Sequence, residues 1–457
     1  MDALAAKVEH TILENGFIKT GDRILVALSG GPDSVALLHL LNHFKPKYDL
    51  RLAAAHLDHA IRPKSADDMQ FCKALCGRMG IRFHHKRLDI KRLAERSGLS
   101  VEEAGRHARY GYFDKLAGRF DYDRIATGHT LDDNVETVIM NMVRGSGLKG
   151  ISGMPYKRGK IIRPLLDCTK DELQAFLKSR KIKYVKDPSN RSLRYARNRI
   201  RHRILPELQK LNPAVRDNLA RLAAIVGEEV EFLSNLTVST CDECLVESGN
   251  AKILLDLAKL GGYHESLRKK VIEEAFKRQS GSFASLTSET LKRVMQVLDG
   301  KSGGRAPLPD GFMIENSQGR VAIFKKTGMA SGCPLVVPGV TMLPDDESRL
   351  DSRILDRSEL PEFDESNQTA FLDFREMNAL IARFWQNGDK IRPLGMKGYR
   401  LLSDIFIDRK IPEFDRNTIP LVVSGDKIAW IAGVMISDEF KITPRTEKVL
   451  KLKLCGR

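Results

Sequence analysis

The residues best suited to chemistry follow a short apolar segment, residues 24–28, near the start of the chain. They are Ser29, Gly30, Gly31, Pro32, Asp33 and Ser34, and they lead directly into the apolar residues 35–41. Two adjacent glycines let a backbone turn approach an anion closely, and a helix that begins there adds the positive end of its dipole. The pattern predicts a phosphate-binding turn between a buried strand and a helix. An ordinary turn in which Asp33 and Ser34 cap the helix is the simpler alternative.

This turn differs from two common nucleotide-binding motifs. It contains no lysine, so it lacks the G-x-x-x-x-G-K-[ST] pattern, and the chain has no G-x-G-x-x-G fingerprint. The turn instead resembles the S-G-G-x-D-S signature of the PP-loop ATP pyrophosphatases. That resemblance implies ATP as the cofactor and cleavage between its α and β phosphates.

A second cluster of polar side chains follows another short apolar segment, residues 124–127. Its members are Gly128, His129, Asp132, Asp133 and Glu136. Helical spacing places Asp132 and Glu136 on one face, with Asp133 beside them. Capping of a helix start explains one carboxylate, but three carboxylates beside a histidine predict a cation site. The cation is either Mg²⁺ held together with ATP phosphates or an ammonium group of a substrate.

Three further residues are weaker candidates for the nucleotide site. His56 ends the second apolar segment, Arg109 lies on a predicted helix, and Arg144 follows the acidic helix. Guanidinium groups bind phosphates through paired hydrogen bonds. A structural histidine and solvated surface arginines are the alternatives.

The positive charge of the chain is concentrated in residues 181–210. Ten of these residues are Lys or Arg and two are Asp or Glu, a net charge of +8, which is half of the +16 carried by all 457 residues. The candidate phosphate-binding residues are Arg191, Arg194, Arg197, Arg201 and Arg203. Nucleic-acid binding draws affinity from such charge because bound cations release counterions from phosphates. A solvated charged helix is the alternative.

Apolar patterning predicts an α/β fold in the first half of the chain. Strands are expected at residues 23–28, 50–57, 82–88 and 124–127, and helices at 34–44, 67–79, 100–117 and 132–144. Such alternation indicates an open parallel sheet with helices on both faces and ligands at the carboxyl ends of the strands. The expected domains are 1–215 for catalysis, 216–330 mainly helical, 331–381 as a connection and 382–457 as a small α+β module.

Length, cysteine usage and hydropathy narrow the class of protein. A chain of 457 residues exceeds what one core usually supports. Its seven cysteines do not form a disulfide framework, and the single C-x-x-C at Cys241 and Cys244 lacks a second pair for a zinc site. No apolar run is long enough to span a membrane, and the start of the chain does not read as a signal peptide. We therefore expect a cytoplasmic protein without a membrane partner.

Taken together, the motifs resemble one PP-loop family, the tRNA(Ile)-lysidine synthetases, over nearly the whole chain. The matching segments are residues 29–34, 56–62, 106–110, 128–137, 144–150, 162–166, 187–201, 388–396 and 402–407. The segment 187–201 discriminates best, because tRNA-thiolating relatives share the first and fourth segments. Residues 220–330 match only in general helical character.

The resemblance implies a two-step reaction on the wobble cytidine of a minor tRNA(Ile) with a CAU anticodon. ATP adenylates O2 of the base and releases pyrophosphate; free L-lysine then attacks C2 and expels AMP. Asp33, Arg109, His129, Asp132, Asp133 and Glu136 are the expected catalytic group, and residues 29–34, His56, Arg109, Gly128 and Arg144 the ATP site. Asp33 and Asp132 are the expected Mg²⁺ ligands, and the five arginines named above bind tRNA. The oligomeric state stays open, with a homodimer as one option.

Three other functions compete with this interpretation. A tRNA thiolase would also adenylate a base, but many carry C-x-x-C pairs in the catalytic domain, and here no such pair precedes residue 240. A noncatalytic tRNA-binding protein would not need the intact turn and acidic cluster. A small-molecule ligase or amidotransferase of the PP-loop type would leave the basic segment without a purpose.

Overall fold

The computed structural model describes residues 3–60, 65–185, 193, 196–249, 251–281, 286–325, 332–343, 348–360, 368–416 and 418–455. The chain divides into two compact units, residues 1–233 and 234–457. Each unit has its own sheets and its own apolar cores. No helix among the described residues is both long and apolar enough to cross a membrane.

A six-stranded sheet organises the first unit, in the order β3-β2-β1-β4-β6-β5. Its strands are β1 (Arg23–Ala27), β2 (Arg51–Asp58), β3 (Arg82–Arg87), β4 (Arg124–Ala126), β5 (Lys157–Arg158) and β6 (Ile161–Ile162). All neighbouring pairs are parallel except the terminal pair β5–β6. The central strand β1 reads Arg-Ile-Leu-Val-Ala and is buried on both faces, as a strand between two helical layers must be.

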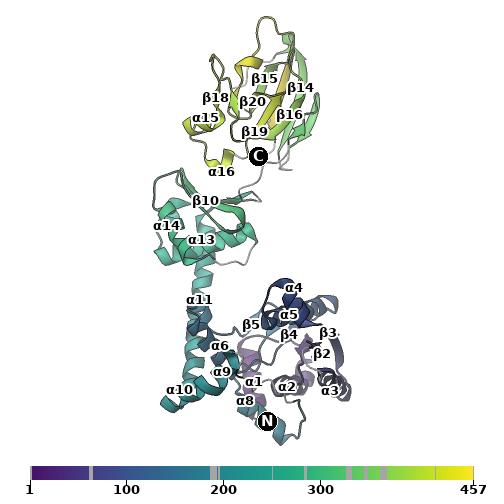
Figure 1. Cartoon of the computed structure of the whole chain (residues 1–457). Coiled ribbons are helices and arrows are strands. Elements are labelled where there is room, and N and C mark those ends of the chain that lie inside the picture. Colours follow the sequence, from purple (N-terminus) through teal and green to yellow (C-terminus); the bar gives the residue numbers. More distant parts are fainter. Residues whose placement is uncertain are drawn as a thin grey trace. The chain divides into compact units, whose positions relative to one another are not determined.

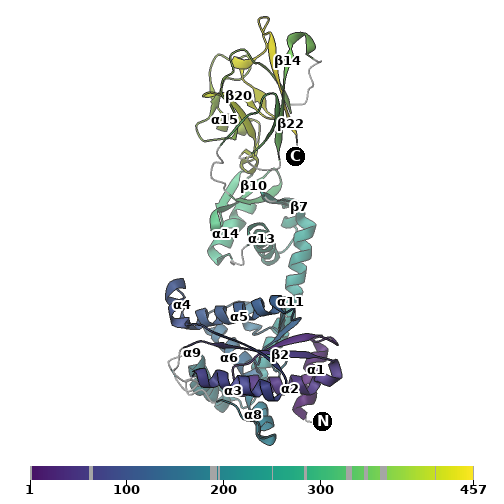
Figure 2. The same cartoon turned by 90° about the vertical axis from the view of Figure 1, so that its right-hand side faces the viewer.

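Helices cover both faces of this sheet (Figure 2). They are α1 (Ala3–Glu14), α2 (Pro32–Tyr48), α3 (Ser65–Arg78), α4 (Ile90–Ser97), α5 (Val101–Arg119), α6 (Leu131–Val143), α7 (Leu148–Ile151) and α8 (Lys170–Ser179). Helices α1, α2, α3 and α8 share one core with Ile24 and Val26, whereas α5 packs on the other face against Leu25 and Ile125. The expected doubly covered α/β sheet is confirmed.

A helical segment follows the sheet in the chain. It consists of α9 (Ala196–Arg199), a π-helical turn (Ile200–Ile204), α10 (Leu205–Leu211) and α11 (Val215–Cys244), which begins in the first unit and ends in the second. Helices α9 and α10 lie beside α6 (Figure 1). Ile200 and Leu205 form a buried core with Val135 and Ile139 of α6. This small core fixes the basic segment beside the acidic helix.

A five-stranded sheet follows α11 in the second unit, within the segment 216–330 that was predicted to be mainly helical. Its strands are β7 (Leu245–Ser248), β8 (Lys252–Asp256), β9 (Gly304–Pro307), β10 (Phe312–Ser317) and β11 (Arg320–Lys325), in the order β7-β8-β11-β10-β9. The helices are α12 (Leu257–Gly261), α13 (Glu265–Ser280) and α14 (Ser288–Leu298). They share a core with one face of the sheet, including Ile314 and Phe276. The segment expected to be mainly helical therefore combines helices with an antiparallel sheet.

The rest of the second unit consists mostly of two antiparallel sheets. One contains β12 (Cys333–Pro334), β16 (Leu380–Phe384), β19 (Pro420–Ser424), β20 (Lys427–Ile431) and β21 (Met435–Ile436); the other contains β13 (Gly339–Met342), β14 (Arg349–Asp356), β15 (Thr369–Asp373) and β22 (Lys448–Cys455). A ribbon of β17 (Lys390–Ile391) and β18 (Arg400–Leu401) precedes α15 (Leu402–Asp408) and α16 (Glu413–Arg416). Trp430 is buried in the core that both large sheets share.

The structure differs from expectation over residues 331–381, which were predicted to be only a connection. Strands β14 and β15 lie within that segment and pair with β22 on its two sides. The reason is that β22 is buried at Leu450 and Leu452, so its main-chain N–H and C=O groups need a paired strand on each edge. The segment is thus part of the same fold as residues 382–457.

Candidate active site

The two turns with candidate site residues meet where the strand order of the first sheet reverses. Strand β1 leads into the turn 29–34, and its neighbour β4 leads into Gly128 and His129. In open α/β sheets, ligands bind in the crevice at such a switch point. Gly128 lets the turns touch, because a Cβ atom there would lie 3.0 Å from the carbonyl carbon of Asp33 and 3.1 Å from the nitrogen of Ser34.

The glycine turn is held in shape by its own serines. Gly30 has a φ of +88°, a conformation that favours glycine. The Ser34 hydroxyl accepts from the Ser29 amide at 3.1 Å and donates to the Gly31 carbonyl at 3.1 Å. Helix α2 then begins at Pro32 without a side-chain cap on its first amides. The turn therefore leaves the positive end of α2 available to an anion, as predicted for phosphate.

Asp33 is the polar side chain of this turn with spare bonding capacity. Its Oδ1 atom is buried and has no hydrogen-bond partner in the described part of the chain. Burial raises the pKa of Asp33 to about 6, against the opposing effect of the nearby Lys170 charge. Mg²⁺ usually takes one or two carboxylates, phosphate oxygens and water, so the free oxygen of Asp33 fits a magnesium ligand.

The carboxylates at the start of α6 are already bound by other groups of the protein. Thr130 and Asp133 form a reciprocal capping box, and the second oxygen of Asp133 accepts from the Lys170 ammonium at 2.8 Å. Asp132 accepts from the Lys170 main-chain amide at 2.8 Å and pairs with Arg216 at 3.1 Å. Asp132 would have to exchange one of these partners before it could bind Mg²⁺. No cluster of three metal-ligating side chains occurs within the described ranges.

Glu136 is the most deeply buried carboxylate of the cluster, with a side chain that is 1% exposed. Arg197 Nε donates to it at 2.9 Å, and Arg201 donates through Nε at 2.6 Å and through Nη2 at 2.8 Å. A buried carboxylate needs such compensation. These two arginines were predicted to bind tRNA, and in the structure their guanidinium groups contact Glu136 of α6.

The pKa values of the acid-base candidates Asp133 and His129 are both lowered, but for different physical reasons. Burial would raise the pKa of Asp133, but the charges of Lys170 and Arg197 outweigh it and hold that pKa well below its usual range. Burial, helped by Arg163, lowers the pKa of His129 to about 3. His129 Nδ1 lies 2.9 Å from the Thr127 hydroxyl. His129 is therefore a neutral, weakly basic ring at neutral pH.

The weaker candidates for the nucleotide site, His56, Arg109 and Arg144, lie at different distances from the glycine turn and the acidic cluster. The buried His56 ring donates from Nδ1 to the Leu28 carbonyl at 2.9 Å, so it braces the residue before the glycine turn. Arg109 on α5 lies 3.2 Å from His59 Nε2. Arg144 follows the far end of α6, and a rise of 1.5 Å per residue puts it roughly 17 Å along the helix from Asp133. The structure does not bring Arg144 to the glycine turn.

The remaining basic candidates divide into two groups. Arg203 is exposed, in the π-helical turn. Arg191 and Arg194 lie outside the described residues, as do the last two residues of the segment 56–62.

Comparison with known proteins identifies the family. The PP-loop domain family matches residues 2–208, and the TilS substrate C-terminal domain family matches residues 380–453. The tRNA(Ile)-lysidine synthase of Clostridium perfringens is 32% identical over 99% of both chains. That of Geobacter sulfurreducens is 31% identical over 100% of this chain and 98% of its own. The chain belongs to the tRNA(Ile)-lysidine synthase family.

Membership of this family decides between the functions that the sequence left open. The curated relatives are tRNA-modifying ligases that align along nearly their whole length, and the PP-loop domain indicates ATP as the cofactor. The three competing functions, namely a thiolase, a noncatalytic tRNA-binding protein and a small-molecule ligase, are therefore excluded. Among solved structures, the U34-tRNA thiolase NcsA from Methanococcus maripaludis matches 49% of this chain and 77% of its own, at 24% identity and a TM-score of 0.43.

Three residues around the lysidine synthase site were missed by sequence reasoning. Lys170, Arg163 and Arg216 all act on the acidic cluster or on His129. Lys170 had a local signal, because Thr169 and Glu172 form a capping box that starts α8 directly behind β6. Arg163 and Arg216 had none, since their roles depend on how distant segments pack.

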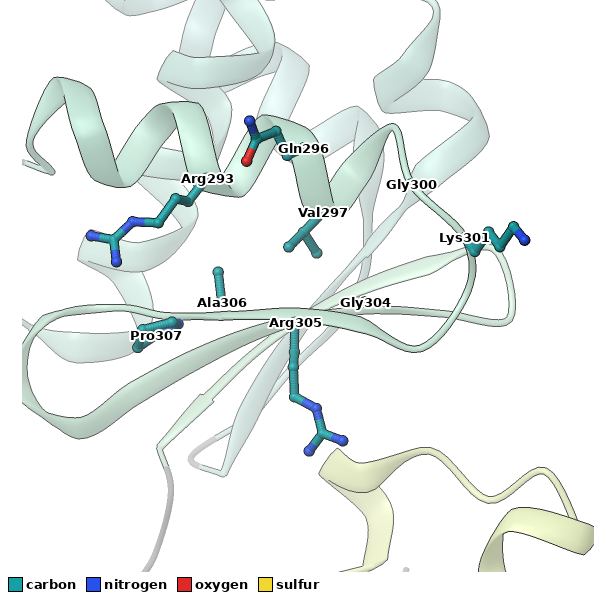
Figure 3. Close-up of a pocket in the computed structure, with 9 residues that line it drawn as sticks. All are labelled: Arg293, Gln296, Val297, Gly300, Lys301, Gly304, Arg305, Ala306 and Pro307. Atoms are coloured by element: carbon teal, nitrogen blue, oxygen red, sulfur yellow. The ribbon is translucent and has the colours of Figure 1, made fainter.

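The second unit contains a pocket of about 320 Å³ between α14 and β9 (Figure 3). Its lining residues include the basic residues Arg293, Lys301 and Arg305. Arg305 points away from α14 and forms an ion pair with Glu413 of α16. The pocket shares no residue with the site at the switch point.

Proposed function

We propose that this ligase forms lysidine by joining L-lysine to C2 of the wobble cytidine in a CAU-bearing tRNA(Ile), with lysine held at the start of α6. The supporting observation is that the acidic cluster and the glycine turn lie at adjacent strand ends, in contact through Gly128. Phosphate and ammonium subsites side by side suit a reaction that joins an adenylated base to an amine. A cytoplasmic location belongs to the same proposal.

In the first step, cytosine O2 attacks the α-phosphorus of ATP and pyrophosphate leaves. The amides of the glycine turn and the positive end of α2 stabilise the charge that develops on the leaving group. Mg²⁺, where bound on Asp33, would supply further charge neutralisation at the phosphates. Arg109 contacts His59, and burial together with the Arg109 charge lowers the pKa of His59 to about 4. When ATP binds, the Arg109 guanidinium leaves His59 and binds a phosphate.

In the second step, the lysine ε-ammonium first gives a proton to a base and becomes an amine, and its nitrogen then attacks C2 as AMP leaves. A general base works best when its pKa is near the working pH. The pKa of Asp33 is about 6, whereas that of His129 is about 3, so Asp33 is the better matched proton acceptor when it does not hold Mg²⁺. We assign His129 the task of shaping the site beside the reacting base.

The decisive experiment measures lysine-dependent AMP release and lysine incorporation with tRNA(Ile) bearing CAU and with a methionine tRNA. We expect both products only with tRNA(Ile). Asp133→Asn should raise the KM for lysine by at least tenfold while the KM for ATP stays within twofold. An unchanged KM for lysine in this variant would remove the proposed lysine site.

A further inference from the structure

Lys170 is a cation of the acidic cluster that belongs to none of the sequence motifs described above. Lys170 is the first residue of α8, and its side chain is 21% exposed. Its main-chain amide donates to Asp132 and its ammonium donates to Asp133, both at 2.8 Å. The residue therefore connects Asp133, the proposed lysine ligand, with Asp132, an expected Mg²⁺ ligand.

The ammonium of Lys170 differs from the other cations of the cluster. Glu136 and Asp132 are paired with guanidinium groups, whose planar forks form fixed, paired hydrogen bonds. Asp133 instead receives a primary ammonium on a flexible four-carbon stem, which is the same group that free lysine carries. Arg201 Nη2 also approaches Asp133, at a longer distance of 3.4 Å.

We propose that Lys170 is a specificity-determining residue that occupies the substrate ammonium position on Asp133 and competes with free lysine for it. The inference rests on the proposed lysine site at the start of α6. When lysine enters, the Lys170 ammonium leaves Asp133, whereas its main-chain amide remains on Asp132 and keeps α8 in place. The internal lysine thus sets the concentration at which free lysine binds.

A destination for the displaced ammonium lies close by. Lys170 is the charged group with the strongest effect on Asp33 of the glycine turn. A triphosphate bound at that turn would attract the same ammonium, so ATP and lysine would draw Lys170 in one direction. We therefore expect ATP to favour lysine binding in the wild-type protein and to favour it less when the ammonium is removed.

The test is Lys170→Met in the full chain, which keeps most of the stem and removes the charge. A ligand that must displace an internal competitor loses affinity in proportion to the fraction of free sites. If Lys170 occupies Asp133 in about nine of ten molecules, its removal lowers the KM for lysine about tenfold. Lys170→Arg keeps a cation and should lower this KM by less than twofold.

Lys178→Met on the exposed side of the same helix is the matched control and should leave the KM for lysine unchanged. A gain in lysine affinity is a specific readout, because a merely damaged site would bind lysine less tightly. A KM for lysine in Lys170→Met that equals or exceeds the wild-type value would overturn the proposal. Lys170→Gln provides the same test if Lys170→Met does not fold.

The parallel variant Asp133→Asn separates this proposal from the proposed function. If Asp133→Asn leaves the KM for lysine unchanged, the lysine site itself is misplaced. If Asp133→Asn raises that KM but Lys170→Met does not lower it, the site stands and the competition by Lys170 is refuted. A higher KM for lysine in Asp133→Asn together with a lower one in Lys170→Met supports both the lysine site and the competition by Lys170.

Discussion

Gly128 is the residue that brings the two chemical turns of the first unit into contact. A methyl group there would lie 3.0 to 3.1 Å from backbone atoms of Asp33 and Ser34, closer than backbone atoms normally tolerate. The turn 29–34 would have to move by a few tenths of an ångström. Because that turn is the proposed phosphate cradle, small displacements should weaken ATP binding more than they destabilise the fold.

We therefore predict that Gly128→Ala raises the KM for ATP about tenfold, equivalent to about 1.4 kcal/mol of binding free energy. The measurement is ATP-dependent AMP release at saturating tRNA and lysine. Gly111→Ala is the matched control, because Gly111 lies on α5 with open space around its Cβ position. An equal change in both variants would contradict the role given to the contact between the turns.

The pKa of His129 makes a second prediction about stability. A histidine with a pKa of about 3 in the fold and about 6.5 when unfolded binds more protons in the unfolded state. Its contribution to stability is complete above pH 6.5 and is lost as the pH falls toward 3. Between pH 7 and pH 5 we expect His129 to account for about 1 to 2 kcal/mol of lost stability.

Urea unfolding of the wild type and of His129→Asn at pH 7 and pH 5 tests this prediction. The variant should lose less stability between the two pH values than the wild type does. His59, whose pKa is lowered to about 4, contributes in the same direction in both proteins and cancels in the comparison. An identical pH dependence in the two proteins would show that His129 titrates normally.

At the scale of elements, the basic segment after residue 196 is attached to α6 through its arginines. Arg201 forms two hydrogen bonds to Glu136, whereas Arg203, two residues later, is exposed. Removing one partner of a buried ion pair leaves an uncompensated charge and typically costs 3 to 5 kcal/mol. Because Arg197 remains on Glu136, the expected loss is at the lower end of that range.

Arg201→Ala should lower the free energy of unfolding by about 3 kcal/mol, and adding Glu136→Gln should recover part of it. Arg203→Ala should change stability by less than about 0.5 kcal/mol. If Arg203 contacts a tRNA phosphate, its loss should also reduce the slope of log affinity against log salt by about 0.8. Urea unfolding and tRNA titration at several salt concentrations separate the two roles.

The predictability of the elements depended on whether the signal was local. Strand β1 and helix α2 were predictable because a buried apolar run and a glycine turn lie within 20 residues of sequence. The acidic cluster at the start of α6 and its helix-capping role were predictable for the same reason, since residues 128–136 are contiguous in sequence. The partners of that cluster were not, because Lys170, Arg201 and Arg216 reach it only through packing of α8, the π-helical turn and α11.

The second unit shows the same limit for strands. Strands β20 and β22 carried clear apolar patterns. Strand β7 is only four residues long and lies in the segment predicted to be mainly helical, whereas β14 contains four charged residues and lies in the predicted connection. Pairing with β8 and β22 determines their structure. Non-local pairing of this kind leaves little trace in a single sequence.

For the whole molecule, 75 basic against 59 acidic residues suit a polyanionic substrate that extends beyond the anticodon. Part of that charge lies on the second unit, in the sheet β13-β14-β22-β15. Lys451 and Lys453 are two residues apart on β22, and Arg353 is directly opposite Lys451 on β14, so all three share one face. Arg353 and Lys453 are exposed, and we expect this face to contact tRNA phosphates outside the anticodon.

The double variant Arg353→Ala/Lys453→Ala should therefore discriminate between a complete tRNA(Ile) and its isolated anticodon stem-loop. Its kcat/KM for the complete tRNA should fall at least tenfold, toward the value for the stem-loop, because two phosphate contacts each contribute to affinity. Its kcat/KM for the stem-loop should stay within twofold, because the glycine turn and the acidic cluster belong to the first unit. Equal losses on both substrates would mean that this face supports folding or chemistry. An unchanged kcat/KM on both would mean that this face does not contact the tRNA.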